Sequence, residues 1–422
     1  MRPPDVTRHL SLVPRAAQIM TTLIEPGQSI GVLGGGQLGA MFASAARRLG
    51  YRTVVWDPDR DAPAFRQADV PIVAPFTDAS ALTRFRESIV AATYEWENVP
   101  YSVGAQLQER RIPVRPAPGI LGLLQNRIDQ KNFLVKTIPV VPFRALHSSD
   151  ELFAAAPHAI TYPAICKTAT SGYDGKGQWR LNSPEDFERL RVVLRDQQAQ
   201  SPQPGAEGWV IEDFLDFDRE LSVIVVRGSD GETRTYPVAD NFHEVGILRI
   251  SRIPAKIDSK ISDQAQTLAR SVVEALDGVG VFCIEMFLMA DGRLFVNEVA
   301  PRPHNSGHYT LDACTVSQFE QQVRTLCCLP LGEVRLLSQA VMLNLLGEEL
   351  IRVTAGEGLV RLLGTPGTKL RIYGKTSIRP RRKMGHVTFL AENAETAWEE
   401  ALALRSFLAN APSGIAQGKE RV

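Results

Sequence analysis

The chain has 422 residues, and its 47 Lys and Arg balance its 47 Asp and Glu, so it carries no formal net charge. This length is enough for two to four domains with real cores. The neutral charge argues against a dedicated nucleic-acid binder. Hydrophobic residues make up 44% and charged residues 22%, which excludes a chain that is disordered throughout. No apolar run approaches the roughly 18–20 residues of a membrane span. Neither nucleic acid nor a membrane is therefore an expected partner.

The cysteines indicate a reducing compartment. Their number is odd and no two are spaced as C-x-x-C, which argues against both a disulfide framework and a zinc knuckle. We therefore expect a cytoplasmic protein whose cysteines stay reduced. These residues are Cys166, Cys283, Cys314, Cys327 and Cys328.

The chain begins with residues 1–28, which are rich in proline and lack a secretory apolar core. We expect them to form a flexible extension. An α/β domain with a Rossmann-like parallel sheet is predicted next, over residues 29–125. An apolar strand over residues 29–33 runs into a glycine-rich turn, a helix over 40–49 follows, and a second strand covers 53–57. This order of elements is a βαβ unit.

The glycine turn of this unit has three interpretations. The spacing Gly34-x-Gly36-x-x-Gly39, with Asp57 at the end of the next strand, fits a dinucleotide site. Free N–H groups at the start of a helix would also suit another phosphate. Alternatively, the glycines only let the turn tighten and the helix pack on the sheet. The first interpretation keeps an NAD-dependent oxidoreductase as an alternative function.

Two further domains are predicted downstream. Residues 126–328 read as an α+β domain on antiparallel sheets, with helices over 126–137, 184–198 and 258–276. Residues 329–410 read as a smaller β-rich domain that ends in a helix over 394–408, and residues 411–422 as a polar tail. The whole is α/β followed by α+β.

The strongest chemical signal is a pair of glutamates in a predicted hairpin. Asp291-Gly292 lies between two alternating apolar runs, which is a strong hairpin signal. A two-residue turn there places Glu285 opposite Glu298, with Cβ atoms about 4.5–5.5 Å apart. Two buried carboxylates would repel unless a cation such as Mg²⁺ lay between them. Alternatively, both point to solvent, or a longer turn shifts the register.

A second glycine-rich segment, Gly172 to Gly177, lies between the predicted strand that carries Lys167 and the strand that begins at Gln178. Its N–H groups and Lys176 could hold a triphosphate. It lacks the G-K-[ST] helix start of a Walker A loop, and a plain hairpin is the alternative. Lys167 is either a phosphate ligand or a lysine whose amine reaches solvent at the strand edge.

Two segments are dense in polar groups, at residues 297–308 and 379–386. The first continues directly from Glu298, so we expect it in the same cleft. The basic second segment is either a solvated face or a clamp for a second anionic substrate.

Taken together, these residues resemble the ATP-grasp superfamily through Lys167, the loop at 172–178, Glu212, Glu220, Glu285 and Glu298. Within it, the chain is similar to the 5-(carboxyamino)imidazole ribonucleotide synthase family. The similarity covers about residues 29–410. Its most specific motifs are Gly36-Gln-Leu-Gly39, Glu95-Trp-Glu-Asn-Val-Pro100, Gly172-Tyr-Asp-Gly-Lys-Gly-Gln178, Pro301-Arg-Pro-His-Asn-Ser-Gly-His-Tyr309, Tyr373-Gly-Lys375 and Arg382-Lys-Met-Gly-His386.

The resemblance implies a homodimer of three-domain subunits: a Rossmann-like pre-ATP-grasp domain, an ATP-grasp domain and a C-terminal substrate-binding domain. It implies ATP and Mg²⁺ as cofactors, with Mn²⁺ as a substitute, and Glu285 and Glu298 as metal ligands. The implied ATP contacts are Arg127, Lys167, Gly172, Tyr173, Asp174, Gly175, Lys176, Gly177, Gln178, Glu212, Asp213, Phe214, Leu215, Glu220, His243, Asn297 and Glu298.

The implied reaction carboxylates 5-aminoimidazole ribonucleotide with bicarbonate through carboxyphosphate, in purine synthesis. Asp174, Arg302 and Lys383 are the implied catalytic residues, Asp174 either as a base or only in positioning the substrate. The implied ribonucleotide phosphate contacts are Gln37, Leu38, Arg302, Lys375, Arg382 and Lys383. Coupling to the downstream mutase is also implied. A formate-dependent glycinamide ribonucleotide ligase of the same superfamily is the nearest alternative.

Overall fold

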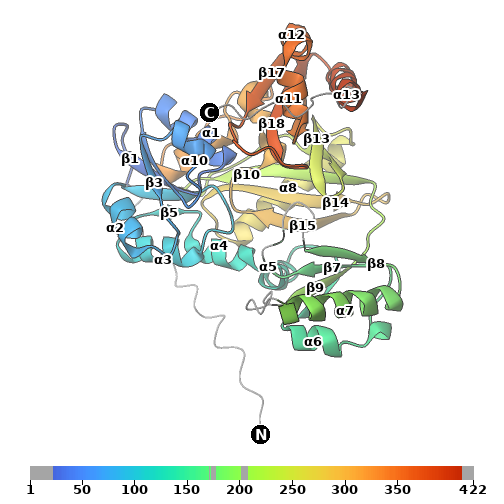
Figure 1. Ribbon diagram of the computed structural model, residues 1–422. Helices are drawn as coiled ribbons and strands as arrows, with labels where there is room; N and C mark the ends of the chain where they lie inside the picture. The colour runs from blue at the N-terminus through green and yellow to red at the C-terminus, as the bar shows by residue number, and fades with distance from the viewer. Residues whose placement is uncertain (1–21, 171, 173–176, 201–207, 411–422) are drawn as a thin grey trace.

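The computed structural model of the protein describes residues 22–170, 172, 177–200 and 208–410 (Figure 1). The predicted 411–422 tail and most of the predicted N-terminal extension lie outside these residues. The described end of the extension is packed, because the Ile24 N–H donates to the Cys327 carbonyl at 3.0 Å and the Tyr51 hydroxyl donates to the Ile24 carbonyl at 2.6 Å. None of the helices in the described ranges is long and apolar enough to cross a membrane.

The N-terminal unit is a parallel five-stranded sheet with the order β3-β2-β1-β4-β5. Alternating apolar residues supply a core on each face. Ile30 and Val32 pack with Phe42 of helix α1 on one face, while Val54 and Trp56 pack with helices α2 and α3 on the other. The elements are β1 (Ser29–Leu33), α1 (Gln37–Arg48), β2 (Arg52–Asp57), β3 (Val70–Val73), α2 (Ala79–Glu87), β4 (Ala91–Tyr94), α3 (Tyr101–Glu109), β5 (Val114–Arg115) and α4 (Pro118–Gln125).

A small antiparallel sheet follows, in the order β6-β9-β7-β8, and helices α6 and α7 cover its outer face at the lower right of Figure 1. Phe187 and Leu190 of α7 pack against Cys166 and Ile211 of the sheet. The elements are α5 (Arg127–Leu134), β6 (Phe143–Leu146), α6 (Ser149–Ala154), β7 (Ala164–Thr168), β8 (Gln178–Leu181), α7 (Pro184–Gln200) and β9 (Trp209–Asp213).

The remaining strands form one nine-stranded sheet, in the order β15-β14-β10-β12-β13-β16-β18-β17, with β11 paired to β10. Its first elements are β10 (Arg219–Arg227), β11 (Thr233–Thr235), β12 (Ala239–Glu244), β13 (Ile247–Ile253), α8 (Ser259–Ala275), β14 (Gly280–Leu288), β15 (Leu294–Ala300), α9 (Thr310–Ala313) and α10 (Gln318–Leu326). The C-terminal elements are β16 (Gln339–Leu346), α11 (Glu349–Thr354), α12 (Gly356–Gly364), β17 (Thr368–Ile372), β18 (Lys383–Ala391) and α13 (Ala394–Asn410).

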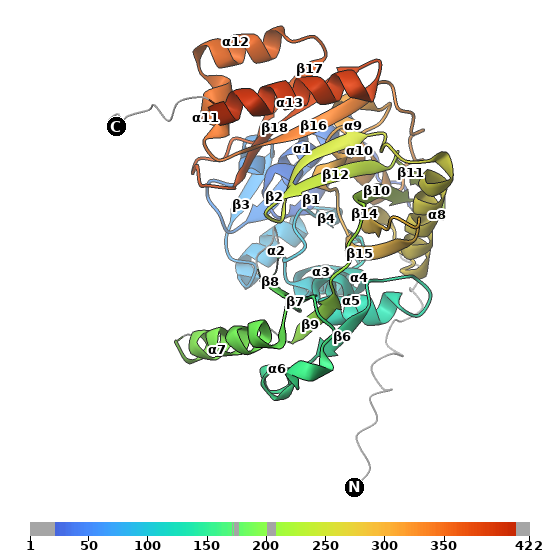
Figure 2. The same ribbon diagram turned by 90° about the vertical axis from the view of Figure 1, so that its right-hand side faces the viewer.

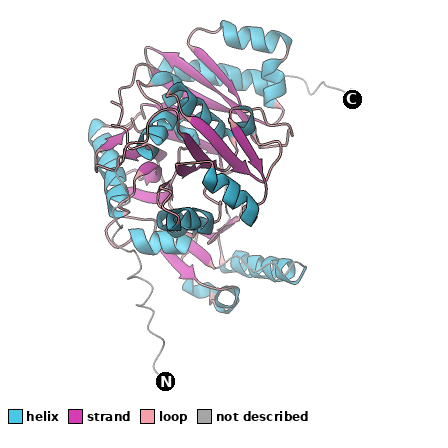
Figure 3. Ribbon diagram, turned by 90° about the vertical axis from the view of Figure 1, so that its left-hand side faces the viewer, coloured by secondary structure: helices cyan, strands magenta, loops and turns pink. Residues whose placement is uncertain are grey.

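The C-terminal strands thus extend the central sheet and do not form a sheet of their own. Ile250 of β13 pairs with Leu343 of β16, and α13 packs over these strands through Ala401 and Leu404. Figure 2 shows α12 and α13 across this end of the molecule. Figure 3 shows the strands crossing the middle, with many of the helices on the outside.

The β14–β15 hairpin has the predicted pairing of Glu285 with Glu298, but the turn differs from the predicted one. The turn has three residues, because the Met289 N–H donates to the Arg293 carbonyl across Ala290, Asp291 and Gly292. The longer turn alone would shift the register by one residue. A β-bulge at Asn297, which has no partner opposite it in the register, restores the pairing.

Helices α5 and α10 join the units. In α5, Gln130 accepts from the Val299 N–H of β15, while Lys131 reaches Glu212 of the small sheet. In α10, Phe319 and Val323 complete the core beneath α1, and Gln322 donates to the hydroxyl of Thr93. The cavity described next is therefore enclosed by units that are fixed to each other by buried contacts.

Candidate active site

A cavity of about 970 Å³ lies where the three units meet. Among the described residues, every site residue expected from the sequence lines it except Gly177. Tyr173, Asp174, Gly175 and Lys176 lie outside the described residues. The expected residues that line the cavity are Gln37, Leu38, Arg127, Lys167, Gly172, Gln178, Glu212, Asp213, Phe214, Leu215, Glu220, His243, Glu285, Asn297, Glu298, Arg302, Lys375, Arg382 and Lys383.

A buried carboxylate between two lysines lies in the wall formed by the small sheet. Glu212 pairs through one oxygen with Lys167 at 2.6 Å and through the other with Lys131 at 2.8 Å. Burial opposes ionisation of Glu212, but the two ammonium groups outweigh it and lower its pKa to about 2. Lys167 also donates to the side chain of Asn297 at 3.4 Å. The wall thus presents a lysine that is anchored to both sheets.

The two glutamates of the hairpin lie on the opposite side of the cavity. Burial raises the pKa of Glu285 to about 7, and the charge of Glu298 adds to the shift. Arg127 lies 3.7 Å from Glu298, and His304 lies 3.1 Å from Glu285. Two acidic oxygens beside open space fit Mg²⁺, which takes oxygen ligands and removes the repulsion between carboxylates.

Cys283, Glu285 and His304 also come within 4.8 Å of one another. A sulfur, an imidazole and a carboxylate would suit zinc. The Cys283 thiol, however, is fully buried in β14 and lies near the Ser306 hydroxyl, and burial raises its pKa far above neutrality. A thiol that stays protonated is a poor ligand, so the oxygen pair is the better candidate metal site.

Glu220 and His243 lie side by side on β10 and β12, with the His243 Nδ1 atom 2.8 Å from a Glu220 oxygen. Burial opposes protonation of His243, but Glu220 outweighs it and raises the pKa of the imidazole. Near them, Phe214 and Leu215 follow strand β9 and also line the cavity. A polar pair beside apolar residues suits a ligand with an aromatic base and hydroxyl groups.

The basic residues gather at the other end of the cavity. Arg302 is paired with Glu97, and the two side chains contact each other closely. Burial alone would lower the pKa of Arg302, but Glu97 outweighs it and holds the guanidinium in its charged form. Lys375 donates to the Lys383 carbonyl at 2.8 Å, and Arg382 donates to the Ser377 carbonyl at 3.0 Å. This end suits a phosphate.

The glycine turn after β1 does not offer a dinucleotide site. Asp57, read as a ribose ligand, instead accepts from the Gly35 N–H at 2.6 Å. Glu95 accepts from the Leu38 N–H at 3.3 Å, and a Cβ atom at Gly36 would lie 2.3 Å from this carboxylate. The turn is therefore closed by two acidic side chains. Leu38 and Gln37 still reach the cavity, but carboxylates lie where a phosphate would bind the helix N-terminus.

Three side chains that the sequence interpretation did not assign belong to this region: Lys131, Glu95 and Glu97. Lys131 stands one helical turn after Arg127, a spacing that places both on one side of α5. Glu95 and Glu97 belong to the Glu-Trp-Glu motif that the resemblance used without assigning a role. Their partners are far away in the chain, so only the folded structure identifies them.

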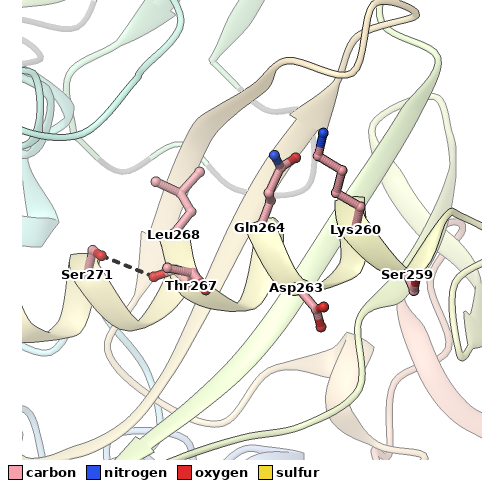
Figure 4. A pocket seen from close by; sticks show the side chains of 7 residues that line it. All are labelled: Ser259, Lys260, Asp263, Gln264, Thr267, Leu268 and Ser271. Carbon is pink, nitrogen blue, oxygen red and sulfur yellow. Dashed lines mark hydrogen bonds between the residues drawn. The ribbon is translucent and has the colours of Figure 1, made fainter.

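A second hollow, of about 590 Å³, runs along helix α8 (Figure 4). Six of its seven lining residues have polar side chains, and the Ser271 hydroxyl donates to the Thr267 carbonyl within the helix. None of the expected site residues lines it. We therefore assign the chemistry to the larger cavity.

An antiparallel sheet facing a larger one across a cavity with paired carboxylates and lysines is the architecture of ATP-grasp enzymes. Family models agree. The ATP-grasp domain matches residues 132–319, the ribonucleotide synthetase preATP-grasp domain residues 28–125, and the phosphoribosylaminoimidazole carboxylase C-terminal domain residues 340–400. The expected fold class is confirmed.

Individual relatives identify the family within the ATP-grasp superfamily. The N5-carboxyaminoimidazole ribonucleotide synthases of Bacillus subtilis and Brucella melitensis are 40% and 39% identical to the chain. The alignments cover 89% and 87% of the chain and 94% and 97% of those proteins. The chain therefore belongs to the N5-carboxyaminoimidazole ribonucleotide synthase family, as the sequence motifs indicated, and it is an ATP-dependent ligase of purine biosynthesis.

Solved structures agree with this assignment. An ADP complex of an N5-carboxyaminoimidazole ribonucleotide synthetase has a TM-score of 0.84 and is 41% identical, covering 92% of this chain and 99% of its own. The Aspergillus clavatus synthase in complex with ADP and 5-aminoimidazole ribonucleotide has a TM-score of 0.80 and is 30% identical, covering 92% and 100%.

Proposed function

We propose that this cavity binds ATP, 5-aminoimidazole ribonucleotide and bicarbonate, and joins them to give N5-carboxyaminoimidazole ribonucleotide, ADP and phosphate. The observation that carries the proposal is the pairing of Glu285 with Glu298 between the cations of the small sheet and those around Arg302. Such an arrangement supports a metal-binding role for the pair, with a phosphate bound on either side. The solved structures of relatives in complex with ADP and with the ribonucleotide support the same two ligands.

In this proposal ATP lies against the small sheet. Backbone groups of Glu212 to Leu215 contact the adenine, and Glu220 accepts from the ribose hydroxyls. Lys167 and Arg127 donate to the phosphates, together with Asn297 and the 172–178 loop. Glu285 and Glu298 would hold Mg²⁺, with Mn²⁺ as a substitute, and the bound ion would supply charge neutralisation at the phosphates.

The ribonucleotide occupies the basic end. We assign its phosphate to Arg302, Arg382, Lys375 and Lys383; Gln37 and Leu38 line the same cavity. A bicarbonate oxygen attacks the γ-phosphorus, the bond to ADP breaks, and carboxyphosphate forms. The amine then attacks the carbon, phosphate leaves, and the amine loses a proton. We propose Asp174 as the acceptor of that proton or as a group that positions the amine.

The experiment measures Mg²⁺-dependent phosphate release from ATP with 5-aminoimidazole ribonucleotide and bicarbonate, each omitted in turn. A parallel mixture holds glycinamide ribonucleotide and formate. Release that requires the imidazole ribonucleotide and yields the carboxylated product supports the proposal. Release only with formate would contradict the proposed substrates, while the fold and the proposed metal site would stand.

A homodimer, a cytoplasmic location and coupling to the downstream mutase complete the proposal. The location is supported by the free state of all five cysteines. Coupling is supported by longer relatives. The chain covers 37% of the bifunctional purine synthesis protein of Dictyostelium discoideum and 64% of the phosphoribosylaminoimidazole carboxylase of Candida glabrata.

A further inference from the structure

Lys131 is a charged side chain that does not reach the cavity. It stands on α5, is 2% exposed, and is absent from the cavity lining. Its Nζ atom lies 2.8 Å from Glu212 Oε1, and no other described residue offers either atom a hydrogen bond. The ring of Phe143 lies 5.6 Å away on its other side. Lys131 therefore has no contact with a ligand in the cavity, and its nearest charged neighbour is Glu212.

Lys167 occupies the other oxygen of the same carboxylate, at 2.6 Å, and does line the cavity. Lys167 pairs with Val210 across the β7–β9 ladder, so Glu212 is two residues along the neighbouring strand and on the same face. One carboxylate thus serves two ammonium groups, of which one faces the ligand and the other lies behind.

The cluster of Lys131, Glu212 and Lys167 holds two positive charges and one negative charge, so it presents a surplus positive charge to the cavity. Without Lys131, Glu212 and Lys167 would form a neutral pair, and a ligand phosphate would compete with Glu212 for Lys167, the one cation left in the cluster. Burying an ammonium group is unfavourable. Burial lowers the pKa of Lys131, and the charge of Lys167 lowers it further against the opposing effect of Glu212. An apolar side chain would fill this position at a lower cost in free energy.

We propose that Lys131 is a positioning residue: it neutralises Glu212 from behind, which leaves Lys167 available to a nucleotide phosphate. The inference rests on the proposed function of Lys167 as an ATP contact. It assigns to the nucleotide site a residue that touches no ligand.

The test compares a single and a double variant by their binding of ADP, measured by calorimetry on the full chain with Mg²⁺ and without the other substrates. Lys131→Met keeps the length of the side chain and removes its charge. We expect the Kd for ADP to rise about tenfold, because Glu212 then holds Lys167. Lys131→Met/Glu212→Gln removes the competing carboxylate as well, and we expect a Kd within about threefold of the unmodified protein. The matched control is Lys136→Met, at an exposed lysine two residues after the end of α5.

A purely structural role would make both variants less stable and leave the Kd unchanged, and that result overturns the proposal. A double variant that binds ADP as weakly as Lys131→Met also overturns it. If Lys131→Met does not fold, the double variant decides alone: a Kd more than about tenfold above that of the unmodified protein contradicts the proposal. If the unmodified protein binds no ADP, the proposed function itself fails, a result that is separate from all of these.

Discussion

At the scale of single residues, the proposed chemistry depends on Glu285 and Glu298, which face each other. Glu285 and Glu298 pair across β14 and β15, and the charge of Glu298 helps to raise the pKa of Glu285. We predict that Glu298→Gln, which keeps the shape and removes the charge, lowers Mg²⁺-dependent phosphate release by about 10²-fold or more.

The measurement is initial rate against Mg²⁺ concentration. Exposed Glu357→Gln serves as the control and should match the unmodified protein. A Glu298→Gln protein with an unchanged rate and an unchanged Mg²⁺ requirement would place the metal elsewhere.

His386 gives a pH prediction at the same scale. It is completely buried in β18, its Nδ1 atom lies 2.9 Å from the Tyr373 hydroxyl, and its Nε2 atom has no partner among the described residues. Burial, with the charge of Arg371, lowers its pKa to about 3. The folded protein then binds fewer protons than the unfolded chain between pH 3 and about 6.5. The stability that His386 contributes is thus complete above about pH 6.5 and is lost as the pH falls toward 3.

We therefore predict that the free energy of unfolding, measured by urea denaturation, falls less between pH 7 and pH 5 in His386→Gln than in the unmodified protein. The difference should be about 2 kcal/mol, from one and a half pH units at 1.36 kcal/mol each. Exposed His158→Gln should leave the pH dependence unchanged. Equal slopes in all three proteins would mean that His386 is not a neutral buried group.

At the scale of elements, the turn of the β14–β15 hairpin connects the two strands that carry Glu285 and Glu298. Gly292 closes its three-residue turn with a φ of 85°, in the left-handed region, and an added Cβ atom would meet only Ile261 at an ordinary 3.4 Å. We predict that Gly292→Ala destabilises the protein by about 1 kcal/mol through backbone strain alone. Gly119→Ala, in α4 with nothing within 4 Å, should be neutral or stabilising when both are measured by chemical denaturation. Equal effects of the two substitutions would mean that the left-handed φ of Gly292 imposes no strain on an alanine.

This hairpin also shows how far the sequence can be read. The pairing of Glu285 with Glu298 is confirmed, yet the predicted two-residue turn is wrong. The longer turn and the bulge at Asn297 compensate each other. Alternation of apolar residues indicates which strands pair, because each face must be buried. It does not reveal a bulge, since one extra residue leaves the pattern on both sides intact.

Some of the other elements were predictable from the sequence and some were not. The βαβ unit, helices α7 and α8 and the final helix were predictable from periodicity and turn residues. Strands β12 and β13 were not predicted. Asp240, Asn241 and His243 interrupt the apolar alternation of β12, and Arg249, Ser251 and Arg252 interrupt that of β13. His243 lines the cavity, and Asn241 donates to the buried Ser222 hydroxyl. Polar residues needed at such positions break the apolar pattern of a strand. Lys131 was missed for a different reason: its partner Glu212 is 81 positions away in the chain.

At the scale of the whole molecule, the continuous nine-stranded sheet makes the C-terminal part a structural requirement. Strand β16 covers the edge of β13 through four paired residues, and β17 is the new outer edge. We predict that a chain ending at residue 336 is insoluble on expression, because it exposes the edge of β13 together with Ile250, which α13 and the C-terminal strands bury. The full chain, expressed in parallel, should be soluble. A soluble truncated monomer that binds ADP would show that the ATP-binding part folds alone.

The central claim is that bicarbonate reacts with the γ-phosphate of ATP in this cavity. The most direct measurement uses bicarbonate labelled with ¹⁸O, together with ATP, Mg²⁺ and 5-aminoimidazole ribonucleotide, and determines the label in the released phosphate by mass spectrometry. The attacking oxygen stays on phosphorus when the carbon is transferred, so the account predicts one ¹⁸O per phosphate formed. Phosphate without the label, released while the carboxylated product forms, would contradict it.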